Sequence, residues 1–103
     1  MKVLDAGHRY EVANFDNPET FQEIAFVSKS PVEEGSKEMK LNFDGTTNEE
    51  LLAVIIDRTK YLNGLFPCRE NSIAITKMEE AKMLFEERTR NRLARNVEGK
   101  HVA

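Results

Sequence analysis

Four side chains in the second half of the sequence are of types that bind nucleotides: Tyr61, Asn71, Arg88 and Arg92. An aromatic ring can stack on a base, a carboxamide can hydrogen-bond to a base edge or a ribose, and guanidinium groups can hold phosphates. No part of the sequence couples a nucleophile to a base or positions a pair of acids for chemistry. The set therefore predicts binding without catalysis, and we expect that the protein is not an enzyme.

The two arginines belong to a stripe that changes its chemistry along one helix. Steps of three and four residues give Ala74, Met78, Ala81, Phe85, Arg88, Arg92 and Arg95. The apolar part of this stripe must pack against something. The guanidinium groups must be solvated, paired with acids or directed at an anionic ligand. A solvated helix end, where arginines complement the helix dipole, is the alternative to a ligand site.

Two helices are expected to position these residues. Thr47, with Glu50 three residues later, forms a capping box, so a helix should begin at about Asn48. Asn63-Gly64 should end it by supplying a left-handed residue. Only residues 65–67 separate this helix from the next, and Cys68 is interpreted as a helix-start residue. So short a link predicts an antiparallel helical hairpin over about residues 48–95.

A DNA-reading helix-turn-helix is the competing interpretation of this hairpin. It is disfavoured because the second helix is too long and its arginines lie at the C-terminal end, whereas such motifs present N-terminal residues to the bases. The net charge of −3 and the isoelectric point near 5.4 also disfavour binding to a nucleic-acid polymer. Four arginines without an acid between residues 88 and 95 instead suit a small phosphorylated molecule.

The positions of Asn71 and Arg92 on one helix set the geometry of any shared pocket. They are about 21 residues apart, which corresponds to on the order of 30 Å. One chain cannot bring them together. A pocket that uses both therefore needs two protomers packed antiparallel.

The N-terminal part of the chain has the pattern of a small antiparallel sheet. Strands are expected at about residues 9–15, 21–29 and 38–43, with turns at Asp16-Asn17-Pro18 and Glu33-Glu34-Gly35. The predicted fold class is α+β, a β-meander over about residues 8–43 followed by the helical hairpin. We expect one domain over residues 1–103, with residues 96–103 as a tail.

The composition bounds the remaining possibilities. A chain of 103 residues buries a thin core, so a homo-oligomer is expected. No run is apolar enough to cross a membrane, and the start does not resemble a signal peptide, so we expect a cytoplasmic protein that binds no membrane. One cysteine, Cys68, and two histidines far apart, His8 and His101, make a metal site improbable. No cofactor is expected.

Three runs of residues carry a resemblance to a known family. They span residues 44–62, 67–81 and 87–99, and the most specific is Arg-Glu-Asn-Ser-Ile-Ala-Ile-Thr-Lys, from Arg69 to Lys77. Together they resemble the phage Thoeris anti-defence family, first type. A related hairpin occurs in phage anti-CBASS sponges, which capture cyclic oligonucleotides.

The resemblance implies a function. The family binds signalling nucleotides derived from cyclic ADP-ribose, which bacterial TIR-domain enzymes make during infection, and sequesters them without degrading them. By position, the ligand-contacting aromatic falls on Tyr61, the asparagine on Asn71, and the phosphate-facing arginines on Arg88 and Arg92. Family members form dimers that assemble into hexamers, and they act in the cytoplasm of the infected host.

Two alternatives stay open. One is a sponge for cyclic di- or trinucleotides, alone or at a second pocket that uses Arg58. That arginine interrupts the apolar residues Ile55 and Leu62, and it could equally snorkel from the edge of an apolar face. The other is a small helical adaptor that binds a protein partner and shows no stabilisation by nucleotides.

Overall fold

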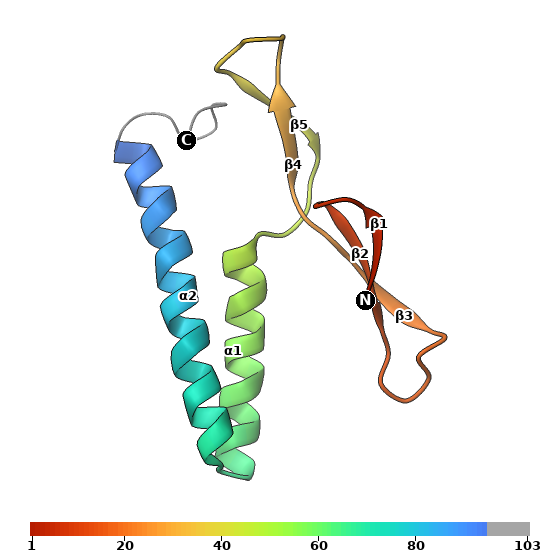
Figure 1. Ribbon diagram of the computed structural model, residues 1–103, viewed down its shortest axis with the longest axis vertical. Helices are drawn as coiled ribbons and strands as arrows, with labels where there is room; N and C mark the ends of the chain where they lie inside the picture. Colours follow the sequence, from red (N-terminus) through yellow and green to blue (C-terminus); the bar gives the residue numbers. More distant parts are fainter. Residues whose placement is uncertain (95–103) are drawn as a thin grey trace. The chain divides into compact units, whose positions relative to one another are not determined.

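Residues 1–94 are described here in a computed structural model of the chain, so Arg95 and the predicted tail at residues 96–103 lie outside the described residues. Strands occupy the N-terminal part and two helices the C-terminal part (Figure 1). The elements are β1 (Lys2–Asp5), β2 (Arg9–Ala13), β3 (Phe21–Ala25), β4 (Ser28–Pro31), β5 (Met39–Phe43), α1 (Asn48–Leu65) and α2 (Arg69–Ala94). The predicted α+β class, a small antiparallel β region followed by a helical hairpin, is confirmed. The chain divides after Thr47 into two compact units.

The first unit contains a three-stranded antiparallel sheet in the order β1-β2-β3 and a separate hairpin of β4 with β5. Val3, Tyr10 and Ile24 lie opposite one another across the sheet, so they share one face. The ring of Phe26 meets Tyr10 edge to face, with 5.9 Å between the ring centroids. The predicted turn after β2 is also present, closed by Asn14 N donating to Thr20 O at 3.0 Å.

Two details of the strands differ from the predictions. Strand β1 was not predicted, because its four residues are too short to show an alternating pattern. The strand expected over residues 21–29 is interrupted after Ala25, because Thr46 from a distant segment bonds there: Thr46 N donates to Ala25 O at 2.8 Å, and Val27 N donates to Thr46 O at 3.0 Å. Gly45 permits this approach, since a Cβ at that position would lie 2.6 Å from Ala25 O. Such a long-range contact leaves no local sequence pattern.

Helix α1 begins at Asn48 as predicted but ends differently. Gly64 is helical, and the glycines with positive φ in the described part of the chain are Gly7 and Gly35, so the predicted left-handed stop at Gly64 is wrong. Phe66 N instead continues the helical pattern by donating to Leu62 O at 2.9 Å. The side chain of Asn63 bridges the turn, because its Oδ1 accepts from Cys68 N at 3.0 Å and its Nδ2 donates to Ser72 Oγ at 3.2 Å.

Helix α2 begins directly after Cys68, whose thiol caps it. The Sγ atom of Cys68 accepts from Asn71 N at 3.4 Å, which is the hydrogen bond of an N-cap to the third helical residue. The interpretation of Cys68 as a helix-start residue is therefore confirmed. The helix has 26 residues, so it is about 39 Å long.

The two helices pack side by side, as the short link predicts (Figure 1). Partly buried residues recur on each helix at alternating spacings of three and four, which is the pattern of two helices packed along one line. We call this line the seam. Its members are Glu49, Leu52, Ile56, Thr59 and Asn63 on α1 and Asn71, Ile75, Met78, Lys82, Phe85, Thr89 and Arg92 on α2. An ion pair between Lys60 Nζ and Glu79 Oε2, 3.1 Å apart, also joins the two helices.

Candidate functional site

Tyr61 and Asn71 lie near the closed end of the helical hairpin. Tyr61 is one turn before the end of α1, and 64% of its surface is exposed. Asn71 lies in the first turn of α2 and is half-buried, with its backbone N–H bonded to the cap at Cys68. The two side chains face different ways, because Asn71 belongs to the seam whereas Tyr61 lies on the side of α1 away from it.

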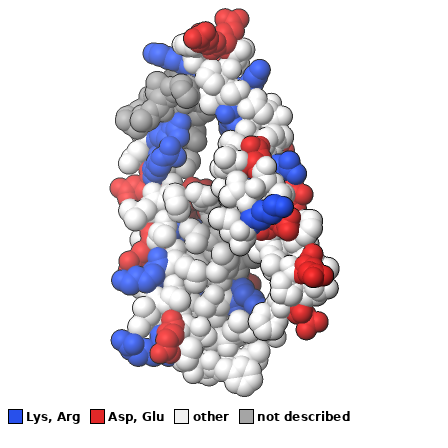
Figure 2. Space-filling model, turned by 45° about the vertical axis from the view of Figure 1, so that its right-hand side comes forward, with Lys and Arg blue, Asp and Glu red and all other residues white. Residues whose placement is uncertain are grey.

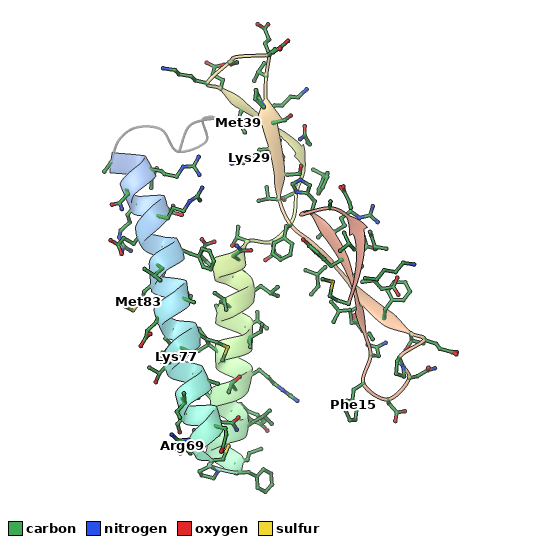
Figure 3. The ribbon with its side chains drawn as sticks, viewed as in Figure 1. Phe15, Lys29, Met39, Arg69, Lys77 and Met83 are labelled. Carbon is green, nitrogen blue, oxygen red and sulfur yellow. The ribbon has the colours of Figure 1, made fainter. Side chains whose placement is uncertain are left out.

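Arg88 and Arg92 lie in the last two turns of α2, at the open end of the hairpin. Arg88 is exposed, and Arg92 is half-buried at the end of the seam. No acid lies between Arg88 and the last described residue, Ala94, and nitrogen-tipped side chains project from this end of the helix (Figure 3). One turn separates the two arginines, so both can contact one pyrophosphate.

The hairpin does not bring these two pairs together within one chain. Asn71 is 17 residues from Arg88 and 21 from Arg92 on one unbroken helix, which corresponds to about 25 and 31 Å. The hydrogen bond between the short side chains of Asn63 and Ser72 places Tyr61 about level with residue 74 of α2, so it is roughly 20 Å along the axis from Arg88. A pocket containing all four residues would need a second copy of the chain.

The stripe predicted from Ala74 to Arg95 spans two sides of α2. Met78, Ala81 and Phe85 are partly buried, as expected for residues that pack. Ala74 and Arg88 are exposed beside the seam. The two arginines thus differ, because Arg88 lies beside the seam and Arg92 lies at its end.

On α1 the apolar residues singled out in the sequence are not those that pack best. Ile56 is the buried hydrophobic residue of the described chain, with 7% of its surface exposed, whereas Ile55 is 43% exposed. Sequence reasoning missed Ile56. The signal that identifies it is the alternating spacing of Leu52, Ile56 and Thr59, which becomes meaningful only once the matching line on α2 is recognised.

Arg58 lies on the side of α1 opposite the seam. Val54, Arg58, Tyr61 and Leu65 recur at spacings of four and three, and all four are exposed. The arginine therefore stands between apolar side chains that the hairpin itself does not cover. Its aliphatic stem can lie along them while its guanidinium reaches an anion or a partner.

A groove of about 350 Å³ runs along one side of the hairpin, and no local pattern predicted it. Its lining residues are Ala53, Ile56, Asp57, Lys60, Glu79, Lys82, Met83 and Glu86. Its two lysines are paired with acids, Lys60 with Glu79 at 3.1 Å and Lys82 with Glu86 at 3.3 Å. None of the four predicted ligand residues lines the groove.

Charges of both signs are interspersed over the surface seen in Figure 2. Within residues 1–94, no group of three or more histidine, cysteine, aspartate or glutamate side chains is placed to hold a metal ion. In that same range neither helix has the length and hydropathy needed to cross a bilayer.

The fold and these residues define an α+β protein built around a helical hairpin that carries ligand-type side chains at both ends. The chain belongs to the Acb2/Tad1 hairpin-domain family, whose model matches residues 19–90. That range contains Arg58, Tyr61, Asn71 and Arg88, and it ends two residues before Arg92.

A comparison with curated proteins finds "Thoeris anti-defense 1" of Bacillus phage SBSphiJ7. It is 51% identical over 59 residues, which are 56% of this chain and 42% of that protein. The matched segment thus spans less than half the length of this relative. The resemblance to the first type of the phage Thoeris anti-defence family is confirmed by the two comparisons.

Proposed function

We propose that this protein is a phage anti-defence sponge that binds and sequesters cyclic ADP-ribose-derived signals, such as glycocyclic ADP-ribose, made by TIR-domain enzymes. Capture of the signal blocks Thoeris immunity in the cytoplasm of the infected bacterial host. The observation that carries this proposal is the family match over residues 19–90, which includes the whole of α1 and most of α2, together with the similarity to a Thoeris anti-defence protein.

The proposed pocket combines the two ends of the hairpin from two protomers. Tyr61 stacks on the base and Asn71 hydrogen-bonds to its edge or to a ribose. Arg88 and Arg92 of the partner subunit hold the pyrophosphate through charge-assisted hydrogen bonds. This arrangement is supported by the length of α2, which keeps Asn71 and Arg92 about 31 Å apart in one chain. The proposed functional unit is a homo-oligomer, a dimer that assembles further into a hexamer, as the family resemblance implies.

The proposed mode of action is stoichiometric capture. Arginine, asparagine and tyrosine side chains can hold a ring-closed dinucleotide, but they supply no nucleophile–base pair to open it. The ligand should therefore leave the protein unchanged. Its effect depends on affinity and on the amount of protein relative to signal.

A thermal-shift screen tests this function. Glycocyclic ADP-ribose at about 100-fold over its dissociation constant should add roughly 2.7 kcal/mol to the free energy of unfolding. Linear ADP-ribose serves as the control for non-specific phosphate binding. An unchanged melting temperature with every cyclic ADP-ribose isomer would instead favour a helical adaptor that recognises a protein partner.

A sponge for cyclic di- or trinucleotides is the second candidate, either alone or at a second pocket. Two observations favour it. The matching family model joins Acb2 and Tad1 under one hairpin domain. Arg58 is an exposed arginine between exposed apolar side chains, on a different side of the hairpin from the seam. Including cyclic dinucleotides in the same screen, with Arg58→Ala as the variant, separates this candidate from the first.

A further inference from the structure

The groove beside the seam is a cavity that the proposed function does not use. Its volume of about 350 Å³ lies within the range of small-molecule sites, which is roughly 300–1,000 Å³. Residues of both helices line it, so the groove exists only while the hairpin is packed. On α1, Ala53, Asp57 and Lys60 are four and three residues apart and therefore lie along one side of the helix. The wall that they form is about 10 Å long.

The base of the groove is apolar. Ile56 lies there, since only 7% of its surface is exposed, and Ala53 beside it is half-buried. Met83 of α2, labelled in Figure 3, contributes an exposed thioether to the opposite wall. A methionine side chain is unbranched and flexible, so Met83 can close over an apolar group that rests on Ile56. The hydrocarbon part of a ligand therefore leaves water when it enters the groove.

The charges that line the groove are unequal. Three carboxylates and two ammonium groups line it, those of Asp57, Glu79, Glu86, Lys60 and Lys82. Lys60 Nζ lies 3.1 Å from Glu79 Oε2, and Lys82 Nζ lies 3.3 Å from Glu86 Oε2. Within residues 1–94, the carboxylate of Asp57 forms no ion pair and no side-chain hydrogen bond. The groove thus has one negative charge in excess and one carboxylate available to a cation.

We propose that this groove binds a small organic cation, a primary ammonium group on an apolar body, such as an alkylamine. The ammonium group lies at Asp57, whose carboxylate accepts charge-assisted hydrogen bonds from it. The hydrocarbon lies on Ile56 and Ala53, and Met83 covers it from the other wall.

Both parts of such a ligand are needed. An ion pair with an exposed carboxylate is screened by water and salt, so an ammonium ion without a hydrocarbon binds weakly. A neutral molecule with the same hydrocarbon lacks the ion pair, and an anionic one is opposed by the excess negative charge. The groove therefore selects a cation, whereas the proposed nucleotide ligand carries negative charge. None of the nucleotide-binding residues of the proposed function lines it.

A series of four small molecules tests this selectivity. The full chain is titrated with n-hexylammonium, n-hexanol, hexanoate and methylammonium, and binding is followed through amide shifts in NMR spectra. The hexyl chain is used because it is shorter than the wall of the groove. Hexylammonium should bind at least about threefold more tightly than hexanol and at least about tenfold more tightly than methylammonium, with hexanoate weakest of the six-carbon ligands. Equal or tighter binding of hexanol or hexanoate overturns the proposal.

Paired variants test the two halves of the site separately. Asp57→Asn keeps the shape of the side chain and removes its charge, so it should weaken hexylammonium binding about threefold or more and leave hexanol binding unchanged. The control is Glu80→Gln, which removes the charge of an exposed acid of α2 that does not line the groove, and it should change neither. Loss of hexanol binding in Asp57→Asn, or no loss of hexylammonium binding, contradicts an ammonium site at Asp57.

The apolar half has a matched pair of its own. Met83 and Leu84 are both large and apolar, with 60% and 67% of their surfaces exposed, but only Met83 lines the groove. Met83→Ala should weaken hexylammonium and hexanol binding together, and Leu84→Ala should weaken neither. Equal behaviour of the two variants shows that the hydrocarbon lies elsewhere on the helix and overturns the proposal.

A competition experiment separates the groove from the nucleotide site. Calorimetric titration with glycocyclic ADP-ribose is done with and without a saturating amount of hexylammonium, with sodium replacing the cation in the second case to keep the ionic strength equal. The two ligands occupy different residues, so the nucleotide affinity should be the same in both titrations. A nucleotide affinity that falls as hexylammonium is added would place the cation in the nucleotide pocket and refute the groove site. Absence of nucleotide binding in both titrations would instead reject the sponge function and leave the groove site intact.

Discussion

Removing both Arg88 and Arg92 should weaken ligand binding far more than it weakens folding. The two residues are one turn apart near the end of α2, where both can contact one pyrophosphate. A hydrogen bond to a charged group contributes about 1.5–3 kcal/mol, so Arg88→Ala with Arg92→Ala should reduce affinity by roughly two to four orders of magnitude if the two effects add.

The structure limits the expected effect on stability. Arg88 is exposed, and an exposed arginine near a helix end contributes on the order of 1 kcal/mol or less to folding. Arg92 is half-buried at the end of the seam, so its removal should cost more than that of Arg88. Circular dichroism and light scattering should therefore show a folded protein with the mass of the parent.

Calorimetric titration with glycocyclic ADP-ribose measures the effect, and Arg90→Ala is the matched control. Arg90 is an exposed arginine of the same helix end, but it lies on another side by helical spacing. Its removal should change affinity less than about threefold, which corresponds to roughly 0.65 kcal/mol. A double variant that binds as tightly as the parent would show that Arg88 and Arg92 are only a solvated helix end.

Three further predictions concern single residues. Tyr61→Ala should weaken binding by about 1–3 kcal/mol through lost stacking, while Tyr61→Phe should retain most of the affinity in the same titration; equal losses would argue against stacking. Ile56→Ala should lower the free energy of unfolding by about 2–5 kcal/mol in urea denaturation, and Ile55→Ala by clearly less, because Ile56 is 7% and Ile55 43% exposed. Cys68→Ser should raise the melting temperature, since a hydroxyl caps a helix better than a thiol, and Cys68→Ala should lower it; the opposite order would contradict the cap.

The sequence predicted the helical hairpin well because local signals define it. The capping box at Thr47 predicted the start of α1, and the short link after Gly64 predicted that the helices are antiparallel. The predicted end of α1 was wrong. The turn between the helices is held by the Asn63 side chain, which bonds to Cys68 and Ser72, and not by a left-handed glycine. These hydrogen bonds depend on the position of α2, which cannot be inferred from the local sequence around Asn63.

The β region was harder to predict for a related reason. The strand expected over residues 21–29 is interrupted by Thr46, more than twenty residues later in the chain. Likewise, Ile56 becomes the best-buried apolar residue only when the seam on α2 is known. For the candidate site, residue types and helical spacing predicted residues at both ends of the hairpin, and the unbroken helix α2 has the separation of Asn71 and Arg92 that the sequence predicted.

The most direct test of the account is the fate of the captured ligand. Protein saturated with glycocyclic ADP-ribose is freed of unbound ligand, denatured by heat, and the released material is identified by mass spectrometry. Capture without catalysis predicts that the intact cyclic compound is recovered, one molecule per pocket, and that this amount does not change after long incubation. A linear or hydrolysed product that accumulates with time and with protein concentration would mean that the protein is an enzyme, and it would contradict the account.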